Sequence, residues 1–200
     1  RLHAAGLSGV VENVEGGAFR VRVFGTAEDV VPLVSRPGFL EFVDFSGLDE
    51  TTRPPDGACI RTTAQAEQFG DAQICPSLAE DTAPFLRPDD TLFETVITGD
   101  GIDAVSAIPS PSGDTWEISF VLLSSADAIF AEFTETHIGE ILAIVLDGEV
   151  ISAPIVLARV SGQGQITGNF IQTEAEMLAN ILSTSYLPRP LELIAVNVFE

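Results

Sequence analysis

The residue types that carry most enzyme chemistry are few and scattered in this sequence. The only histidines are His3 and His137, and His137 falls in the last turn of a predicted helix, where a cation is favoured by the helix dipole. No Gly-x-Ser-x-Gly motif occurs, and no Ser/His/Asp or Cys/His arrangement typical of a nucleophile and its base is evident. We therefore expect no enzyme, with no turnover of nucleotides, peptides or esters.

The glycine-rich and acidic segments are better explained by turns and by solvation than by ligands. Gly162 and Gly164 resemble part of a dinucleotide-binding loop, but Thr167 stands where the third glycine is required and Gly168 comes one position late. Lysine is absent, so the lysine of a phosphate-binding loop is missing as well. The tightest acidic groups lack the spacing of a calcium loop: Asp89-Asp90 and Asp100/Asp103. We expect no cofactor and no metal ion.

The two cysteines, Cys59 and Cys75, enclose a segment rich in Thr, Gln, Ala and Asp. No Cys-x-x-Cys motif or Cys/His cluster accompanies them, so a structural zinc site is not expected. In an oxidising compartment the pair would form a disulfide, and in a reducing one it would remain as two free thiols. Two cysteines alone leave both outcomes open.

The charge of the chain is strongly unbalanced, with 30 acidic and nine basic residues and a net charge of −21. Such a surface repels nucleic acid and anionic lipid headgroups, and it attracts basic segments. It also serves solubility or adaptation to salt.

No apolar run is long enough to span a membrane. Residues 141–160 are the most apolar stretch, and charges and Pro154 interrupt them. No signal peptide is present, and the first residues have the pattern of a last helical turn that ends at Gly6. We therefore expect an excised segment of a longer protein.

The first half of the chain predicts short strands and one long insertion. Residues 10–14 and 18–24 form a predicted hairpin around a Glu15-Gly16-Gly17 turn, and a short helix through Val34 and a strand over 38–45 follow. Residues 47–90 are rich in Pro, Thr and Asp and have little periodicity, which predicts an irregular excursion. Strands are predicted again over 92–98 and 105–108.

The most regular pattern lies in residues 116–199. It predicts strand 116–123, helix 124–137, strands 141–146 and 149–157, a loop over 162–168, helix 173–185 and strand 191–198. Each helix starts with a predicted capping box, Ser124 with Asp127 in the first and Thr173 with Glu176 in the second. The predicted core face of the first helix is Ile129, Phe130 and Phe133. The order β-α-β-β-α-β predicts an α+β, ferredoxin-like antiparallel sheet with both helices on one face.

These elements suggest three units. Residues 1–46 would form a partial base subdomain of order β-β-α-β, residues 47–91 a Cys-bearing excursion, and residues 92–200 the α+β subdomain. The last strand of the third unit could rejoin the base.

One predicted hairpin contains a candidate sheet edge. Asp147-Gly148 is a strong hairpin signal because both residues tolerate positive φ. The return strand contains Pro154, which cannot donate to a ladder, so residues 151–155 are predicted to lie at a sheet edge or bulge. An edge strand can accept an extended peptide as an added strand.

Several motifs resemble one known family. The segment from Leu142 to Pro154, LAIVLDGEVISAP, and the segment GQITGNF from Gly164, with TEAEMLA after it, are similar to the large extracytoplasmic domain of SecD, a subunit of the Sec protein-export machinery. Weaker matches lie at 1–8, 37–42, 130–139 and 187–191. Residues 47–90 match no motif of the family that we can name.

The resemblance implies a non-enzymatic domain, without a cofactor, that engages preprotein emerging from the Sec channel and assists its translocation. It implies a periplasmic or outer-face location, a membrane anchor in the full-length protein, and SecF-like and SecY-like partner subunits. The family motifs supply the candidate polypeptide-binding residues: Asp147, Gly148, Ile151, Ser152, Ala153, Pro154, Gly164, Thr167 and Gly168. The alternative is a diverged envelope protein that uses the fold as a scaffold or as a module for binding a small ligand or protein; a hydrolase lacks its catalytic groups.

Overall fold

The computed structural model describes residues 8–14, 18–23, 31, 36–72, 74–78, 82–184 and 186–187. Several predictions lie outside these residues: the helix end at Gly6, the turn at residues 15–17, the helix through Val34 apart from Val31, and the closing strand over 191–198.

The described elements form three antiparallel sheets. The strands are β1 (Gly9–Val14), β2 (Ala18–Val23), β3 (Leu40–Asp44), β4 (Glu94–Thr98), β5 (Ile102–Pro109), β6 (Trp116–Leu122), β7 (Leu142–Leu146), β8 (Glu149–Ser152) and β9 (Gln163–Phe170). The helices are α2 (Thr63–Phe69), α3 (Ser124–Thr136) and α4 (Gln172–Leu182), with a 3₁₀ turn η1 at Gly99–Gly101. The strand orders are β1-β2, β4-β3-β7-β8 and β5-β6-β9. No helix among the described residues is long and apolar enough to cross a membrane.

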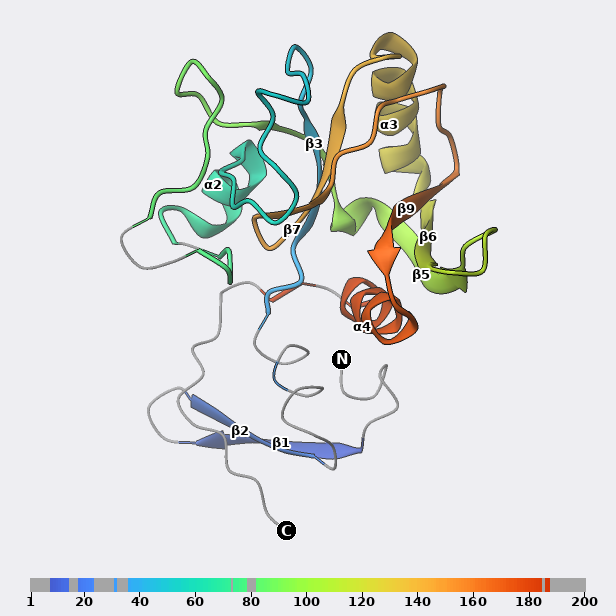
Figure 1. Ribbon diagram of the computed structural model, residues 1–200. Helices are drawn as coiled ribbons and strands as arrows, with labels where there is room; N and C mark the ends of the chain where they lie inside the picture. The colour runs from blue at the N-terminus through green and yellow to red at the C-terminus, as the bar shows by residue number, and fades with distance from the viewer. Residues whose placement is uncertain are drawn as a thin grey trace.

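Residues 36–187 form what we call the two-sheet body, because its core lies between the four-stranded and the three-stranded sheet (Figure 1). Phe42 of β3 packs on Phe120 of β6 and on Phe130 of α3, with ring centroids 5.2 and 5.0 Å apart. Along β6, Ile118, Phe120 and Leu122 are buried, and the residues between them are more exposed. This period of two is typical of a sheet with one face on the core and one in water.

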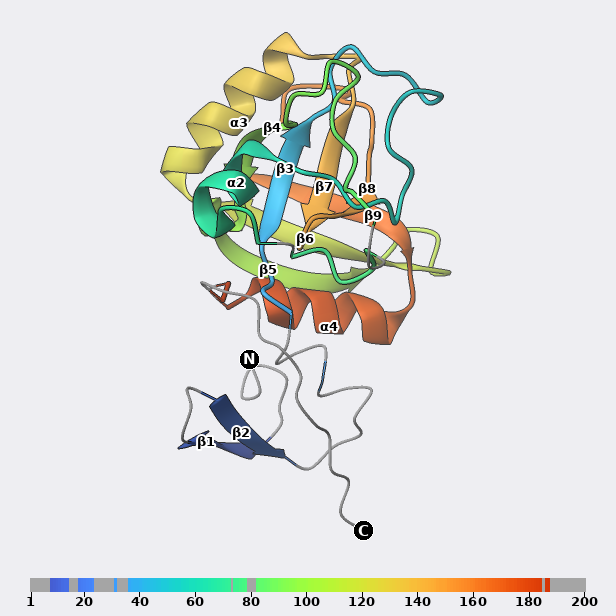
Figure 2. The same cartoon turned by 90° about the vertical axis from the view of Figure 1, so that its left-hand side faces the viewer.

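A second core covers the opposite face of the four-stranded sheet. Residues 47–91, which we call the cover segment, place Ile60 against Val43 and Val145 in this core, and Figure 2 shows α2 beside β3, near β4. All five residues of β7 are buried, as expected for a strand with both faces covered. The cover segment also contains an unpredicted helix, α2, whose first turn is capped by Thr62.

The single ferredoxin-like sheet predicted for residues 116–199 is not the fold that is observed. The α+β character and the antiparallel pairing are confirmed, but β6 lies in the three-stranded sheet and β7 and β8 lie in the four-stranded one. The strand β3, which the sequence placed with residues 1–46, pairs with both β4 and β7. The apolar run of β7 is typical of a strand with a neighbouring strand on each edge and side chains packed on each face. The order of elements in the sequence does not identify these neighbours.

The segment 162–168, predicted as a loop, is mostly strand β9. Gly162 keeps the positive φ, 78°, of a turn glycine. Gly164 instead permits close packing, because a Cβ there would lie 2.4 Å from the ring of Phe120 on the neighbouring strand. A side chain at residue 164 would therefore displace a core ring.

Details of the two predicted helices also differ. Asp127 does not cap α3; its carboxylate accepts hydrogen bonds from Gly162 N at 2.6 Å and from Ser161 Oγ. Ile129 is 54% exposed, because α3 buries the stripe Ala126, Phe130 and Thr134 instead. At α4, Glu174 rather than Glu176 accepts from the backbone, at Ile171 N.

Candidate functional site

The predicted hairpin turn Asp147-Gly148 lies at the end of the two-sheet body where the chain enters. Asp147 has φ 54° and is fully buried. Its Oδ1 accepts a hydrogen bond from Phe39 N at 2.8 Å, and its own N–H donates to Phe39 O at 2.9 Å. The turn therefore holds both backbone groups of Phe39, where the chain leads into β3.

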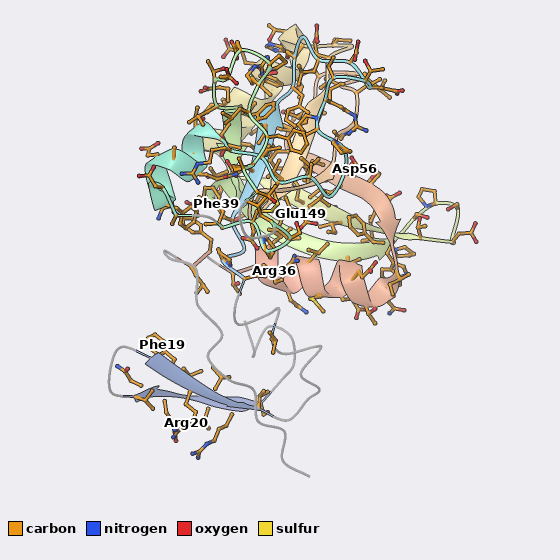
Figure 3. The ribbon with its side chains drawn as sticks, turned by 60° about the vertical axis from the view of Figure 1, so that its left-hand side comes forward. Phe19, Arg20, Arg36, Phe39, Asp56 and Glu149 are labelled. Atoms are coloured by element: carbon orange, nitrogen blue, oxygen red, sulfur yellow. A yellow bond between two sulfur atoms is a disulfide. The ribbon has the colours of Figure 1, made fainter. Side chains whose placement is uncertain are left out.

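The same end, which we call the neck (residues 36–39 and 184–187), is closed by aromatic rings. The ring of Phe39 meets those of Phe69 and Tyr186 edge-on, with centroids 5.1 and 4.9 Å away. Leu187 N donates to Pro37 O at 2.8 Å, so the chain enters and leaves the body side by side. Figure 3 shows the labelled Phe39 and Arg36 at this end.

A buried carboxylate fastens the cover segment to the sheet. Glu41 of β3 is fully buried and accepts hydrogen bonds from Thr62 Oγ1, from Gln65 Nε2 at 2.7 Å and from Thr95 Oγ1 at 2.8 Å. Burial raises the pKa of Glu41, and the three hydrogen bonds and the charge of Arg61 oppose that rise. The sequence analysis did not identify this group.

The cover segment is also fixed covalently and along its edge. Cys59 and Cys75 form a disulfide. Backbone hydrogen bonds join Gly57 and Ala58 to Val150, and Ile60 N donates to Gly148 O at 2.8 Å. The cover segment therefore occupies the outer side of β8 over residues 148–150.

Beyond that point the edge is exposed. Residues 153–157, which we call the outer edge, continue β8 and pair on one side with residues 140–142, as the bonds Leu142 N to Pro154 O and Val156 N to Glu140 O show. Ile155 is 50% and Leu157 85% exposed, and Ile138, just before the paired segment, is 58% exposed. Three exposed apolar side chains therefore lie on the outer edge and beside the segment that pairs with it.

The outer edge lies at the end of the body opposite the neck. Strand β3 starts at the neck with Leu40 and ends at Asp44, which pairs with Leu142, the first residue of β7. Residues 138–141 and 154–157 adjoin that far end, near the top of Figure 2, where α3 also ends. His137 ends α3, as expected, and stacks on Phe133 with ring centroids 4.0 Å apart.

The structure divides the nine predicted polypeptide-binding residues among three places. Asp147 and Gly148 lie beside the neck, and Ile151, Ser152, Ala153 and Pro154 lead from β8 into the outer edge. The remaining three belong to β9 in the other sheet: Gly164, Thr167 and Gly168. They do not form one site. Leu157, the most exposed apolar residue of the outer edge, was missed, although its period-two spacing from Ile155 would have indicated it.

The described residues contain no group of three or more His, Cys, Asp or Glu side chains placed to hold a metal ion. Asp49 has a pKa lowered to about 2 by hydrogen bonds from Thr51 and Thr52, but these contacts form an exposed turn.

Comparison with known proteins identifies one family. The family model described as the SecDF P1 head subdomain matches residues 78–189. A protein translocase subunit SecD from Elusimicrobium minutum is 30% identical over 180 residues, which cover 81% of this chain and 36% of that protein. The SecD of Aquifex aeolicus is 49% identical over 81 residues, 40% of this chain and 16% of that protein. The chain thus spans well under half the length of these relatives.

A solved structure leads to the same family. It is a structure of SecDF, described as a membrane component that enhances protein export, and it is 26% identical, with a TM-score of 0.66. The match covers 99% of this chain and 88% of that one. The family model, the curated relatives and the fold agree, and the chain therefore belongs to the SecDF P1 head family, as a periplasmic domain of a SecD-type protein-export subunit.

Proposed function

We propose that this domain binds unfolded segments of exported polypeptides on the outer side of the membrane, without catalysis, and assists their translocation. Its partners in the full-length protein would be the preprotein and SecF-like and SecY-like subunits. The observation that carries the proposal is the outer edge, where exposed Ile155 and Leu157 lie on a strand at the far end of an acidic domain.

Two physical effects support capture of such a substrate. The net charge of −21 attracts cationic chains over a range that is screened to about 10 Å at 0.1 M salt. At short range, exposed apolar side chains gain by burial against apolar residues that an unfolded chain exposes and a folded one hides. Affinity should be modest, because the bound segment must be ordered.

The test is a titration of the domain with a labelled, permanently unfolded basic polypeptide, at low and at moderate salt. We expect binding that weakens as salt rises and that also weakens in the double variant Ile155→Ser/Leu157→Ser. The matched control is Ile171→Ser, which removes an equally exposed isoleucine at the start of α4. Since Ile171 lies on the other sheet's side of the body, this control should bind like the parent.

The outcomes separate the hypotheses. Absence of binding even at low salt would exclude polypeptide binding and favour the hypothesis that the domain is a scaffold. Binding that ignores salt would assign recruitment to apolar contacts and remove charge from the proposal. Equal binding by the parent and the double variant would exclude the outer edge as the binding site.

A further inference from the structure

The outer edge has backbone groups that face away from the sheet. In an antiparallel ladder, hydrogen bonds to one neighbouring strand use every second residue, and the residues between direct their N–H and C=O to the other side. Pro154 and Val156 use their backbone groups toward Leu142 and Glu140. Ile155, opposite Ile141 in the same ladder, therefore directs its N–H and C=O outward.

These outward groups have no partner in the described part of the chain. No hydrogen bond among the described residues involves the backbone of Ala153, Ile155 or Leu157. The same side of β8 is filled two residues earlier, where Gly57 and Ala58 bond to Val150. A turn closed by the bond from Ala58 N to Pro55 O precedes these contacts, and no backbone hydrogen bond among the described residues joins residues before Gly57 to residues 153–157.

We propose that residues 153–157 bind one extended segment of unfolded polypeptide as an added β-strand, in line with residues 57–60 of the cover segment. This inference rests on the proposed function and specifies its binding mode. Residues 57–60 show that an extended segment fits this side of the sheet, because they already pair there in an antiparallel sense at Cys59 and Glu149.

The geometry also defines the substrate class. A strand added here pairs with the outward N–H and C=O groups of alternate residues, so its own residues must be free of proline at the pairing positions. Its side chains on one face would meet Ile155 and Leu157, which lie two residues apart. A segment with apolar residues at every second position and basic residues between them suits both the edge and the charge of the domain.

The test compares Ile155→Pro with Ile155→Ala. Both variants remove the exposed side chain, but only proline removes the outward N–H, and the ladder to residues 140–142 does not use that group. The probe is a basic decapeptide with valine at every second position. We expect Ile155→Pro to bind it about five- to tenfold more weakly than Ile155→Ala does, the loss of one hydrogen bond. Circular dichroism and urea unfolding check that both variants fold.

A second measurement needs no protein variant. Two versions of the decapeptide carry N-methyl groups on alternate amides, in one register or in the other. Strand addition predicts that methylation of the alternate amides that face the edge weakens binding strongly, whereas methylation of the other set, which faces solvent, weakens it less. Equal affinity of all three peptides, or equal binding by Ile155→Pro and Ile155→Ala, would overturn strand addition while leaving polypeptide binding itself intact.

Two further results are distinguishable. If the parent domain binds neither the decapeptide nor the unfolded polypeptide at low salt, the proposed function fails together with this inference. If the parent forms a dimer that Ile155→Pro abolishes, the edge pairs with a second copy of the chain, and the inference of a polypeptide substrate is overturned.

Discussion

At the scale of single residues, Glu41 connects the cover segment to the sheet at an energetic cost. Its carboxylate is fully buried, its three donors come from neutral side chains, and its pKa is raised by burial. The pKa of Glu41 is thus higher in the folded state than in the unfolded state. The stability that protonated Glu41 contributes is fully present at a pH below the pKa of the unfolded state, and it is lost as the pH rises through the pKa of the folded state. Deprotonation of Glu41 therefore destabilises the domain.

We predict that Glu41→Gln makes the domain more stable than the parent at pH 8, by roughly 1–3 kcal/mol, and that the gain shrinks toward pH 4. The glutamine keeps one oxygen for Thr62 and Thr95, and its amide can donate to Gln65 Oε1, a buried atom without a hydrogen-bond partner among the described residues. Urea unfolding across this pH range measures the effect. Glu132→Gln, on the exposed face of α3, is the control. A variant that is less stable than the parent at pH 8 would contradict the argument.

Asp147 shows what a local sequence pattern can predict and what it cannot. The pair Asp147-Gly148 predicts a hairpin turn because positive φ is needed at both positions, and the structure has φ 54° and 81° there. Asp90 also has a positive φ, of 62°, yet it is exposed, whereas Asp147 is buried and holds the backbone of Phe39. The turn is local and was predictable, but the contact with a residue 108 positions away was not.

At the scale of elements, the cover segment depends on its disulfide. The described part of residues 47–91 contains one short helix, α2, and covers a core made by other strands. The bond between Cys59 and Cys75 closes a loop with a sequence separation of 16, which stabilises the folded state by about 3 kcal/mol in the chain-entropy model.

We predict that the double variant Cys59→Ser/Cys75→Ser loses about 3 kcal/mol of unfolding free energy. Amide exchange should accelerate most in the cover segment, and less in β6, which packs in the other core. Thiol titration of the native, unreduced protein should find no free thiol. Two reactive thiols in that titration would contradict both the bond and an oxidising location.

Strand β9 shows why some elements escape prediction. Its sequence, QGQITGNF, has two glycines and only two large apolar residues, which is typical of a loop. It is a strand because Ile166 fills the core next to Ile118, and because Gly164 leaves room for the ring of Phe120. Both reasons depend on a neighbour more than forty residues earlier in the chain.

At the scale of the whole molecule, the order of elements was largely predictable and their assembly was not. The alternation of Trp116–Leu122 and the helical pattern of Ser124–Thr136 are properties of the segments themselves. The insertion of β3 between β4 and β7 depends on which strands share a core, and hydrophobic patterns do not encode partners. The outer edge is a mixed case: Pro154 indicated an edge, but only the structure shows that the cover segment closes it up to Val150 and leaves it open beyond.

The two-sheet body has the features of an independently folding unit, and we predict that residues 36–187 alone fold cooperatively. Among the described residues, all buried members of the two cores lie between Leu40 and Ala175, so excision removes none of them. The hydrogen bond from Leu187 N to Pro37 O and the ring contacts of Phe39 keep the two ends of the excised chain together. About 150 residues also suffice to bury a stable core. We expect the excised body to unfold in urea in one transition, with the same midpoint as the corresponding transition of the 200-residue chain. The opposite result would be a weaker dependence of the unfolding free energy on urea, together with binding of a hydrophobic dye. It would show that residues outside 36–187 are needed to order the neck.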